Sequence, residues 1–203
     1  EKYEPEAKAA PDADSLYDVI NRMLGELNAS HAVLISKDVY RDHFACEMSG
    51  RKTLQAGLEL VLRAGGYYVS SVLEGGPAQA AGVRKGDRVF AVDDRSPEDS
   101  KALVDAGYDR GIPSDPHFFL RVDRDDPVTL LIQSTLDESS LRRVEFLPGR
   151  TNMIEASRAS VRVIRQKGFR AGYVHLHHFL ANEIASIFSK AISGPLADCD
   201  ALV

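Results

Sequence analysis

Apolar residues recur at helical spacing near both ends of the chain. The first stripe consists of Leu16, Val19, Ile20, Met23, Leu24 and Leu27. Residues three and four apart lie on one face of a helix, so this stripe predicts a packed helix over 15–27, with Ser15 and Asp18 resembling a capping box. The second stripe consists of Ile184, Ile187, Phe188 and Ala191. It predicts an amphipathic helix over 181–192, which Gly194-Pro195 would end.

Short extended patterns fill the middle of the chain. The predicted strands are 32–35, 69–72, 88–92, 128–134 and 142–147, and a further apolar segment begins at 118–120. In the strand at 142–147, Val144 and Phe146 alternate with charged residues, so one face should be buried. A small helix at 79–81 should stop at Gly82, because glycine takes a left-handed cap without a Cβ penalty. Ser96-Pro97-Glu98 predicts the start of a helix that continues to about Tyr108.

The last fifty residues predict a strand–helix–strand unit. An extended segment at 159–166 turns at Lys167-Gly168, and strands follow at 172–176 and 200–203 on either side of the second helix. A βαβ unit needs a parallel partner sheet. Because so few strands are available, we expect the sheet to be incomplete and the sequence to stop inside a domain.

Composition narrows the range of partners. A length of 203 residues allows one large or two small domains, and a hydrophobic fraction of 44% allows a real core. The net charge is -5. No long block of Lys and Arg is present, so we expect neither nucleic acid nor an anionic membrane as a partner. No apolar run approaches the roughly 20 residues of a membrane span. Cys46 and Cys199 fit no metal-binding spacing, and two buried free thiols are the favoured interpretation.

Histidines at two places in the chain could take part in catalysis or metal binding. Ser30-His31 follows the first helix, where an imidazole could be oriented for general-base work, but taken alone the pair is more typical of a helix terminus. His175 and His177 would share a strand face, with His178 next to them, which raises the question of a metal site. No cysteine lies close by and the nearest downstream acid is Glu183. This pattern favours polar residues that line the edge of a cleft, so we expect no metal and no other cofactor.

The stretch GGPAQAAGVRKGDRVFAVDD, which begins at Gly75, resembles a PDZ domain. The resemblance implies a peptide-binding module in which Gly57, Leu58, Glu59 and Leu60 form the carboxylate-binding loop, one step away from the family's usual Gly-Leu-Gly-Phe. The order of elements is similar to the permuted PDZ domains of bacterial processing proteases. Arg51 and Lys52 would either assist this loop in holding a carboxylate or be simple surface charges. The alternative is a glycine-cornered β-domain without a peptide groove.

The chain as a whole resembles the tail-specific, or C-terminal processing, serine peptidases of the tricorn-like branch. The segments that carry the resemblance are GELNASH, ending at His31, the PDZ-like block, and the segments ASVRVI, GYVHL, GPLAD and DALV, which resemble the entry into a protease core. The resemblance implies an α+β fold. Its parts would be an N-terminal helical segment (1–45), a PDZ-like β-barrel module (46–150) and the first βαβ part of an incomplete peptidase core (151–203).

The same resemblance assigns roles to two residues. His31 would be the general base, and Ser30 would help to orient the catalytic tetrad. The nucleophile, the acid and the oxyanion loop lie further downstream in the family, so these 203 residues alone should be inactive.

We therefore expect the N-terminal part of a serine endopeptidase that binds unfolded polypeptides or their C-termini. The peptide would add as a strand beside 58–62. The alternative is a non-catalytic interaction module, whose peptide binding would not change in a His31→Ala variant. Oligomeric state stays open, as does the choice between a periplasmic or secreted and a cytoplasmic location.

Overall fold

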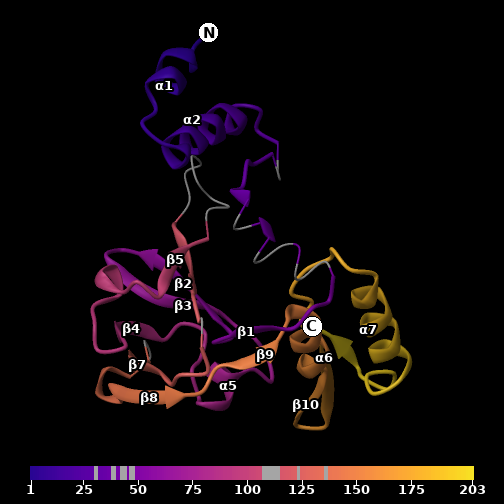
Figure 1. The fold of residues 1–203 in the computed structure, drawn as a ribbon. Coiled ribbons are helices and arrows are strands. Elements are labelled where there is room, and N and C mark those ends of the chain that lie inside the picture. Colours follow the sequence, from indigo (N-terminus) through magenta and orange to yellow (C-terminus); the bar gives the residue numbers. More distant parts are fainter. Residues whose placement is uncertain are drawn as a thin grey trace.

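The computed structural model describes residues 1–29, 32–37, 40–41, 45, 49–106, 115–122, 124–134 and 137–203. A helical arm at the N-terminus stands above a large β-sheet, and a smaller unit of helices and strands lies beside that sheet (Figure 1). The chain is thus of the α+β class, as the sequence predicted.

One antiparallel sheet of seven strands dominates the fold, in the order β5-β6-β2-β3-β4-β7-β8. Its strands are β2 (Leu58–Arg63), β3 (Gly66–Val72), β4 (Arg88–Val92), β5 (Leu103–Asp105), β6 (His117–Leu120), β7 (Val128–Gln133) and β8 (Arg142–Phe146). The two outermost strands, β5 and β8, do not pair with each other in the described part of the chain. The sheet is therefore open, as expected of a PDZ fold, which is only a partial barrel. The predicted β-barrel module is thus present without closing into a complete barrel.

The main hydrophobic core lies on this sheet. Leu60, Leu130 and Ile132 are completely buried at its centre. In β8 the predicted alternation is confirmed, because Val144 and Phe146 are buried while the charged residues between and beside them are exposed. Burial of alternate side chains is what fixes the register of such a strand.

A short helix, α5 (Pro77–Ala80), connects β3 to β4. Gly82 follows it with a φ of 83°, which confirms the predicted glycine stop. Gly57 also has a positive φ, 77°, and a Cβ built there would lie 3.3 Å from the Cδ of Pro77. The loop before β2 thus approaches α5 closely at a position that favours glycine.

The prediction of a helix over 96–108 is wrong for the described residues of this segment, 96–106. Pro97–Asp99 forms only a 3-10 turn, η2, and Leu103–Asp105 then continues as strand β5. The Ser-Pro-Glu start signal therefore gives a single turn. The residues after it pair with β6 instead, because the tertiary sheet offers them hydrogen-bond partners.

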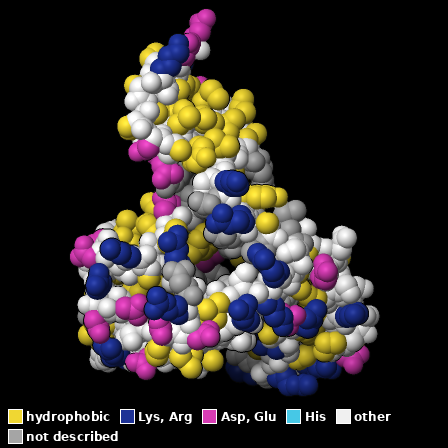
Figure 2. Space-filling view, in the orientation of Figure 1, with side chains coloured by type: hydrophobic (Ala, Val, Ile, Leu, Met, Phe, Trp, Pro, Cys, Tyr) yellow, Lys and Arg dark blue, Asp and Glu magenta, His cyan; other side chains and the backbone are white. Residues whose placement is uncertain are grey.

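The N-terminal arm contains α1 (Glu4–Ala9) and α2 (Ala13–Gly25). Asp12, not Ser15, caps α2, and its carboxylate accepts a hydrogen bond from the Ser15 N–H at 2.8 Å. The strand expected at 32–35 is absent; the amide of Asn21 holds the backbone of Leu34 there instead. Figure 2 shows hydrophobic side chains gathered over this arm, and Met23 and Leu27 are among the exposed ones.

The C-terminal unit is joined to the sheet by a two-stranded ribbon of β1 (Thr53–Gln55) and β9 (Gly149–Thr151). It then forms α6 (Met153–Ser160), β10 (Arg162–Gln166), β11 (Phe169–Tyr173), α7 (Asn182–Ser193) and β12 (Ala201–Leu202). Strands β11 and β12 are parallel, which confirms the predicted βαβ unit. The helix α6 was missed, and the first two residues of the predicted extended segment at 159–166 belong to it. Within the described residues, no helix is long and apolar enough to cross a membrane.

Candidate functional site: a loop above a covered strand edge and a Glu-His cluster

The predicted carboxylate-binding loop lies at the start of β2 and borders a cavity of about 870 Å³. Gly57, Leu58 and Glu59 line this cavity. The Gly57 carbonyl accepts a hydrogen bond from the Leu73 N–H at 2.9 Å, which ties the loop to the end of β3. The cavity also reaches residues of β5, of the end of β6 and of α2.

Side chains alternate along the loop and the start of β2. Leu58 and Leu60 point into the core, with exposed fractions of 6% and 0%, whereas the half-buried Glu59 lines the cavity. Burial raises the pKa of the Glu59 carboxyl group above its usual value. An ionised Glu59 would repel a peptide carboxylate, so protonation of Glu59 or a compensating cation favours such a ligand. Arg51 and Arg121 also line the cavity and could supply that compensation.

Both edges of β2 are paired in the structure. On one side it pairs with β3, and on the other with β6, in the register Glu59 with Phe119, Leu60 with Phe118 and Val61 with His117. The place beside 58–62, where we expected an added peptide strand, is therefore taken by the chain itself.

The covering strand β6 packs against the sheet through its side chains as well as its backbone. The ring of Phe118 lies 5.5 Å from that of Tyr67, centroid to centroid. Because β6 runs antiparallel to β2, its last residue, Leu120, lies toward the Gly57 loop, where it is 5% exposed and lines the same cavity. Leu120 is therefore an apolar side chain beside the predicted carboxylate-binding loop.

The predicted catalytic residues Ser30 and His31 lie outside the described residues, and so does Cys46. Lys52 is directed elsewhere than the loop, because its ammonium group lies 3.5 Å from the Glu155 carboxylate. Arg51, in contrast, borders the cavity.

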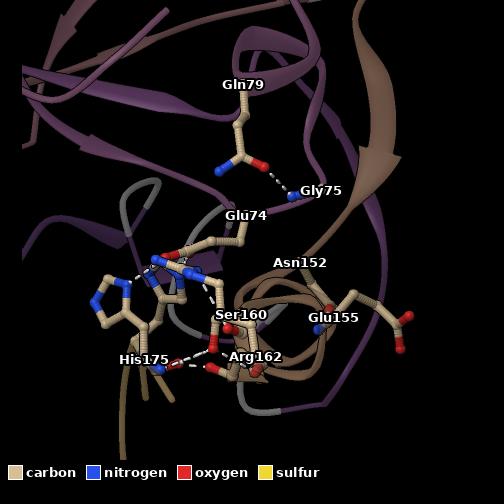
Figure 3. A network of polar contacts seen from close by, with 10 residues as sticks. Glu74, Gly75, Gln79, Asn152, Glu155, Ser160, Arg162 and His175 are labelled. Atoms are coloured by element: carbon tan, nitrogen blue, oxygen red, sulfur yellow. Dashed lines mark hydrogen bonds and ion pairs between the residues drawn. The ribbon is translucent and has the colours of Figure 1, made fainter. Parts of the chain in front are cut away.

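A second polar cluster joins the loop after β3 to the segment after β11. The Glu74 carboxylate lies between two imidazoles, with Oε1 3.0 Å from Nδ1 of His175 and Oε2 2.7 Å from Nε2 of His177 (Figure 3). The two imidazole centroids are 3.9 Å apart. His177 is nearly buried, whereas the His175 side chain is 42% exposed.

Buried serines of α6 hold the backbone that carries both histidines. The His175 N–H donates to Ser160 Oγ at 2.7 Å, and the His177 N–H donates to Ser157 Oγ at 3.1 Å. Both serines are completely buried. The two histidine backbones are thus held from one helix, and their side chains converge on a residue of the other unit.

Burial and hydrogen bonding act in opposite directions in this cluster. Burial alone would raise the pKa of Glu74, but the hydrogen bonds from His175 and His177 outweigh it and the pKa is lowered. For His177 burial dominates, and its pKa is lowered despite the neighbouring carboxylate. Glu74 is therefore an anion that accepts from both rings, and His177 favours its neutral form, in which an imidazole can bind a metal ion.

Sequence reasoning located the histidines but missed Glu74. The acid was sought downstream of His175, whereas the partner lies 101 residues upstream. The sequence does contain a local signal for α6, the helix that holds the histidine backbone. Asn152 and Glu155 have the spacing of a capping box, and Asn152 caps α6 in the structure. No local signal indicates Glu74.

Comparison with known proteins identifies part of the chain. Residues 55–130 match the family model of the PDZ domain. No curated protein sequence matches the chain. Among solved structures, a photosystem II D1 C-terminal processing protease is similar at 18% identity and a TM-score of 0.47, with 94% of this chain and 49% of that one covered. A candidate S41 protease from Bacteroides fragilis is similar at 13% identity and a TM-score of 0.38, with 70% of this chain and 37% of that one covered. The chain thus spans about half or less of the length of these two structures.

Proposed function

We propose, from the premise that residues 55–130 form a PDZ domain, that the chain is the peptide-recognition part of a tail-specific serine endopeptidase. The observation that carries the proposal is the position of the Gly57–Leu60 loop, at the rim of a cavity and at the head of strand β2. In this proposal the ligand is the C-terminal end of an unfolded polypeptide. Its carboxylate binds to the backbone N–H groups of the loop.

In this proposal the peptide binds by strand exchange, in which it displaces β6 from the edge of β2. Strand β6 has four residues and β5 only three, and this hairpin joins the rest of the sheet through β2. Such a short edge element has few hydrogen bonds to lose. A peptide that ends in an apolar residue replaces β6 on β2, and its last side chain takes the position of Leu120.

Peptide binding is tested by fluorescence anisotropy with a labelled decapeptide that ends in Leu-Leu-Val. The same peptide with a C-terminal amide is the control for the carboxylate. A second control locks β6 to β2 by a disulfide between Val61→Cys and His117→Cys, which are opposite each other in the register. Opposed Cα atoms in an antiparallel pair lie about 4.5–5.5 Å apart, within the range that a disulfide spans. The natural cysteines, Cys46 and Cys199, are replaced by serine in this variant.

The proposal predicts binding of the acid peptide and at least about tenfold weaker binding of the amide, since the charge-assisted hydrogen bonds are lost. The oxidised lock should abolish binding, and reduction should restore it. Binding that is equal with the lock closed and open would exclude strand exchange. No binding of the acid peptide by any form would exclude the peptide-recognition function.

The peptidase part of the proposal assigns His31 as general base and Ser30 as its orienting partner. It is tested with the full-length natural protein on an unfolded substrate such as reduced, alkylated casein. Turnover should fall by about 10²–10⁴-fold in His31→Ala, since that is the usual contribution of general-base catalysis. His178→Ala serves as a control for the loss of a histidine elsewhere. Peptide binding without turnover in the parent protein would favour the non-catalytic interaction module instead.

A further inference from the structure

Glu74, His175 and His177 present a set of metal ligands that the peptide-binding proposal does not use. One ligand atom from each residue can be chosen so that all lie within 4.8 Å of one another. Two imidazole nitrogens and a carboxylate oxygen are the protein ligands of many zinc sites that keep a fourth position for water. We propose that these three side chains bind one divalent transition-metal ion, of which Zn²⁺ is the best fit.

The distances are compatible with an ion between the three groups. Zinc bonds to nitrogen and oxygen are about 2.0–2.2 Å long, so tetrahedral ligand atoms lie about 3.4 Å apart. The two hydrogen-bonded pairs, at 3.0 and 2.7 Å, would open by less than about 1 Å. The ion would replace the two hydrogen bonds with one coordinate bond to each of the two imidazole nitrogens and at least one to the Glu74 carboxylate.

The surroundings restrict how the ligands move. The backbone of both histidines is fixed by the buried serines of α6. On the other side, the Gly75 N–H donates to the Gln79 side chain at 2.8 Å (Figure 3). The Leu73 N–H donates to the Gly57 carbonyl, so the backbone on each side of Glu74 is held as well. Ligands held in this way lose little conformational freedom when an ion binds.

Burial gives the site one closed and one open side. The side chains of Glu74 and His177 are 11% and 4% exposed, whereas that of His175 is 42% exposed. An ion can therefore enter past His175, and water can occupy the remaining coordination position. Imidazole and carboxylate ligands without a thiolate favour Zn²⁺ over softer ions such as Cu(I).

The consequence of binding is a cross-link between two parts of the fold. Glu74 belongs to the loop between β3 and α5 in the PDZ domain, and the histidines follow β11 in the C-terminal unit. An ion that binds the folded chain and not the separated ligands stabilises it by mass action.

The test measures zinc binding by the 203-residue chain, without an affinity tag, after treatment with a chelator. Isothermal titration with Zn²⁺ should give one ion per chain. Glu74→Gln and His175→Gln should each weaken binding by at least about tenfold, since even outer-shell partners of a metal site contribute 10–100-fold. His178→Gln and Cys199→Ser are the matched controls and should bind as the wild type does. Urea unfolding of each apo variant verifies that it is folded.

Cobalt substitution provides an independent readout. Co²⁺ in the proposed site should give the visible absorption of a four- or five-coordinate ion with nitrogen and oxygen ligands, without a thiolate charge-transfer band. The wild type should also unfold at a higher temperature with Zn²⁺ than without it, and Glu74→Gln should not. No zinc binding at micromolar concentrations would overturn the inference, as would unchanged affinity in both Glu74→Gln and His175→Gln. None of these readouts depends on peptide binding or peptidase activity.

Discussion

At the scale of single residues, the cavity beside the loop contains a carboxyl group in an unfavourable position. Glu59 alternates with the buried Leu58 and Leu60, so the strand directs its side chain to the half-buried surface that lines the cavity. Burial disfavours the charged form and raises the pKa of Glu59. Burial of Glu59 therefore lowers the free energy of unfolding at pH values at which the side chain is ionised in the folded state.

Replacement of Glu59 by Gln should therefore make the protein more stable at neutral pH. A carboxyl group with a raised pKa in the folded state contributes stability below its unfolded pKa, near 4.5, and loses it as the pH rises through the folded pKa. Glutamine does not titrate, so the difference in unfolding free energy between Glu59→Gln and wild type should grow as the pH rises from the acid side of 4.5. Urea unfolding across this range measures the difference. Glu145→Gln, on the exposed face of β8, is the control, and a pH-independent difference for Glu59→Gln would contradict the explanation.

At the scale of elements, α6 is the framework of the Glu-His cluster, and a single buried side chain begins it. The Asn152 amide oxygen accepts from the Glu155 N–H at 2.8 Å, and its NH₂ group donates to the Gly50 carbonyl at 2.7 Å. Asn152 is only 2% exposed. One residue thus caps the helix and ties it to the chain that precedes β1.

Asn152→Ala should destabilise the protein by about 2–4 kcal/mol, since it removes a cap worth about 1 kcal/mol and leaves a carbonyl without its partner at a cost of about 1–3 kcal/mol. Asn152→Ser separates the two contributions, because a serine hydroxyl can cap the helix but is too short to reach Gly50. It should recover about 1 kcal/mol of the loss. Chemical unfolding gives both values, and equal losses in the two variants would mean that the cap contributes nothing.

At the scale of the whole molecule, the two parts of the fold have cores of very different size. The core of the seven-stranded sheet includes Leu60, Val92 and Leu130, all completely buried. The core between α6 and α7 is smaller and is built around Ile154, Ile184 and Ile187. Phe188, expected on the packed face of α7, is 38% exposed. Because stability follows buried apolar surface, the C-terminal unit should open more easily.

Native-state hydrogen exchange should therefore be slower in the sheet than in α7. We expect protection factors for buried amides of β2, β4 and β7 to exceed those of α7 by at least about tenfold, as for separate units of unequal stability. Protection factors correct for intrinsic exchange rates, so the comparison between the sheet and α7 reports only how often each of them opens. Equal protection in both parts would mean that they unfold as one cooperative unit.

The sequence by itself determined the features that depend on near neighbours in the chain. Gly82 ends α5, the residues of β8 alternate between core and solvent, and β11, α7 and β12 form a parallel βαβ unit, all as predicted. The stretch from Gly75 indicated a PDZ domain, which the family match confirms. These signals are local because steric limits on φ, side-chain periodicity and capping act over a few residues.

Only the tertiary structure decided what surrounds the two candidate sites. It placed β6 on the edge of β2, where the sequence suggested a peptide, because an unpaired strand edge is satisfied by any segment that the fold brings beside it. It also brought Glu74 between His175 and His177 across 101 residues of sequence. Such pairings depend on how whole elements pack, and no local pattern of residue types encodes them.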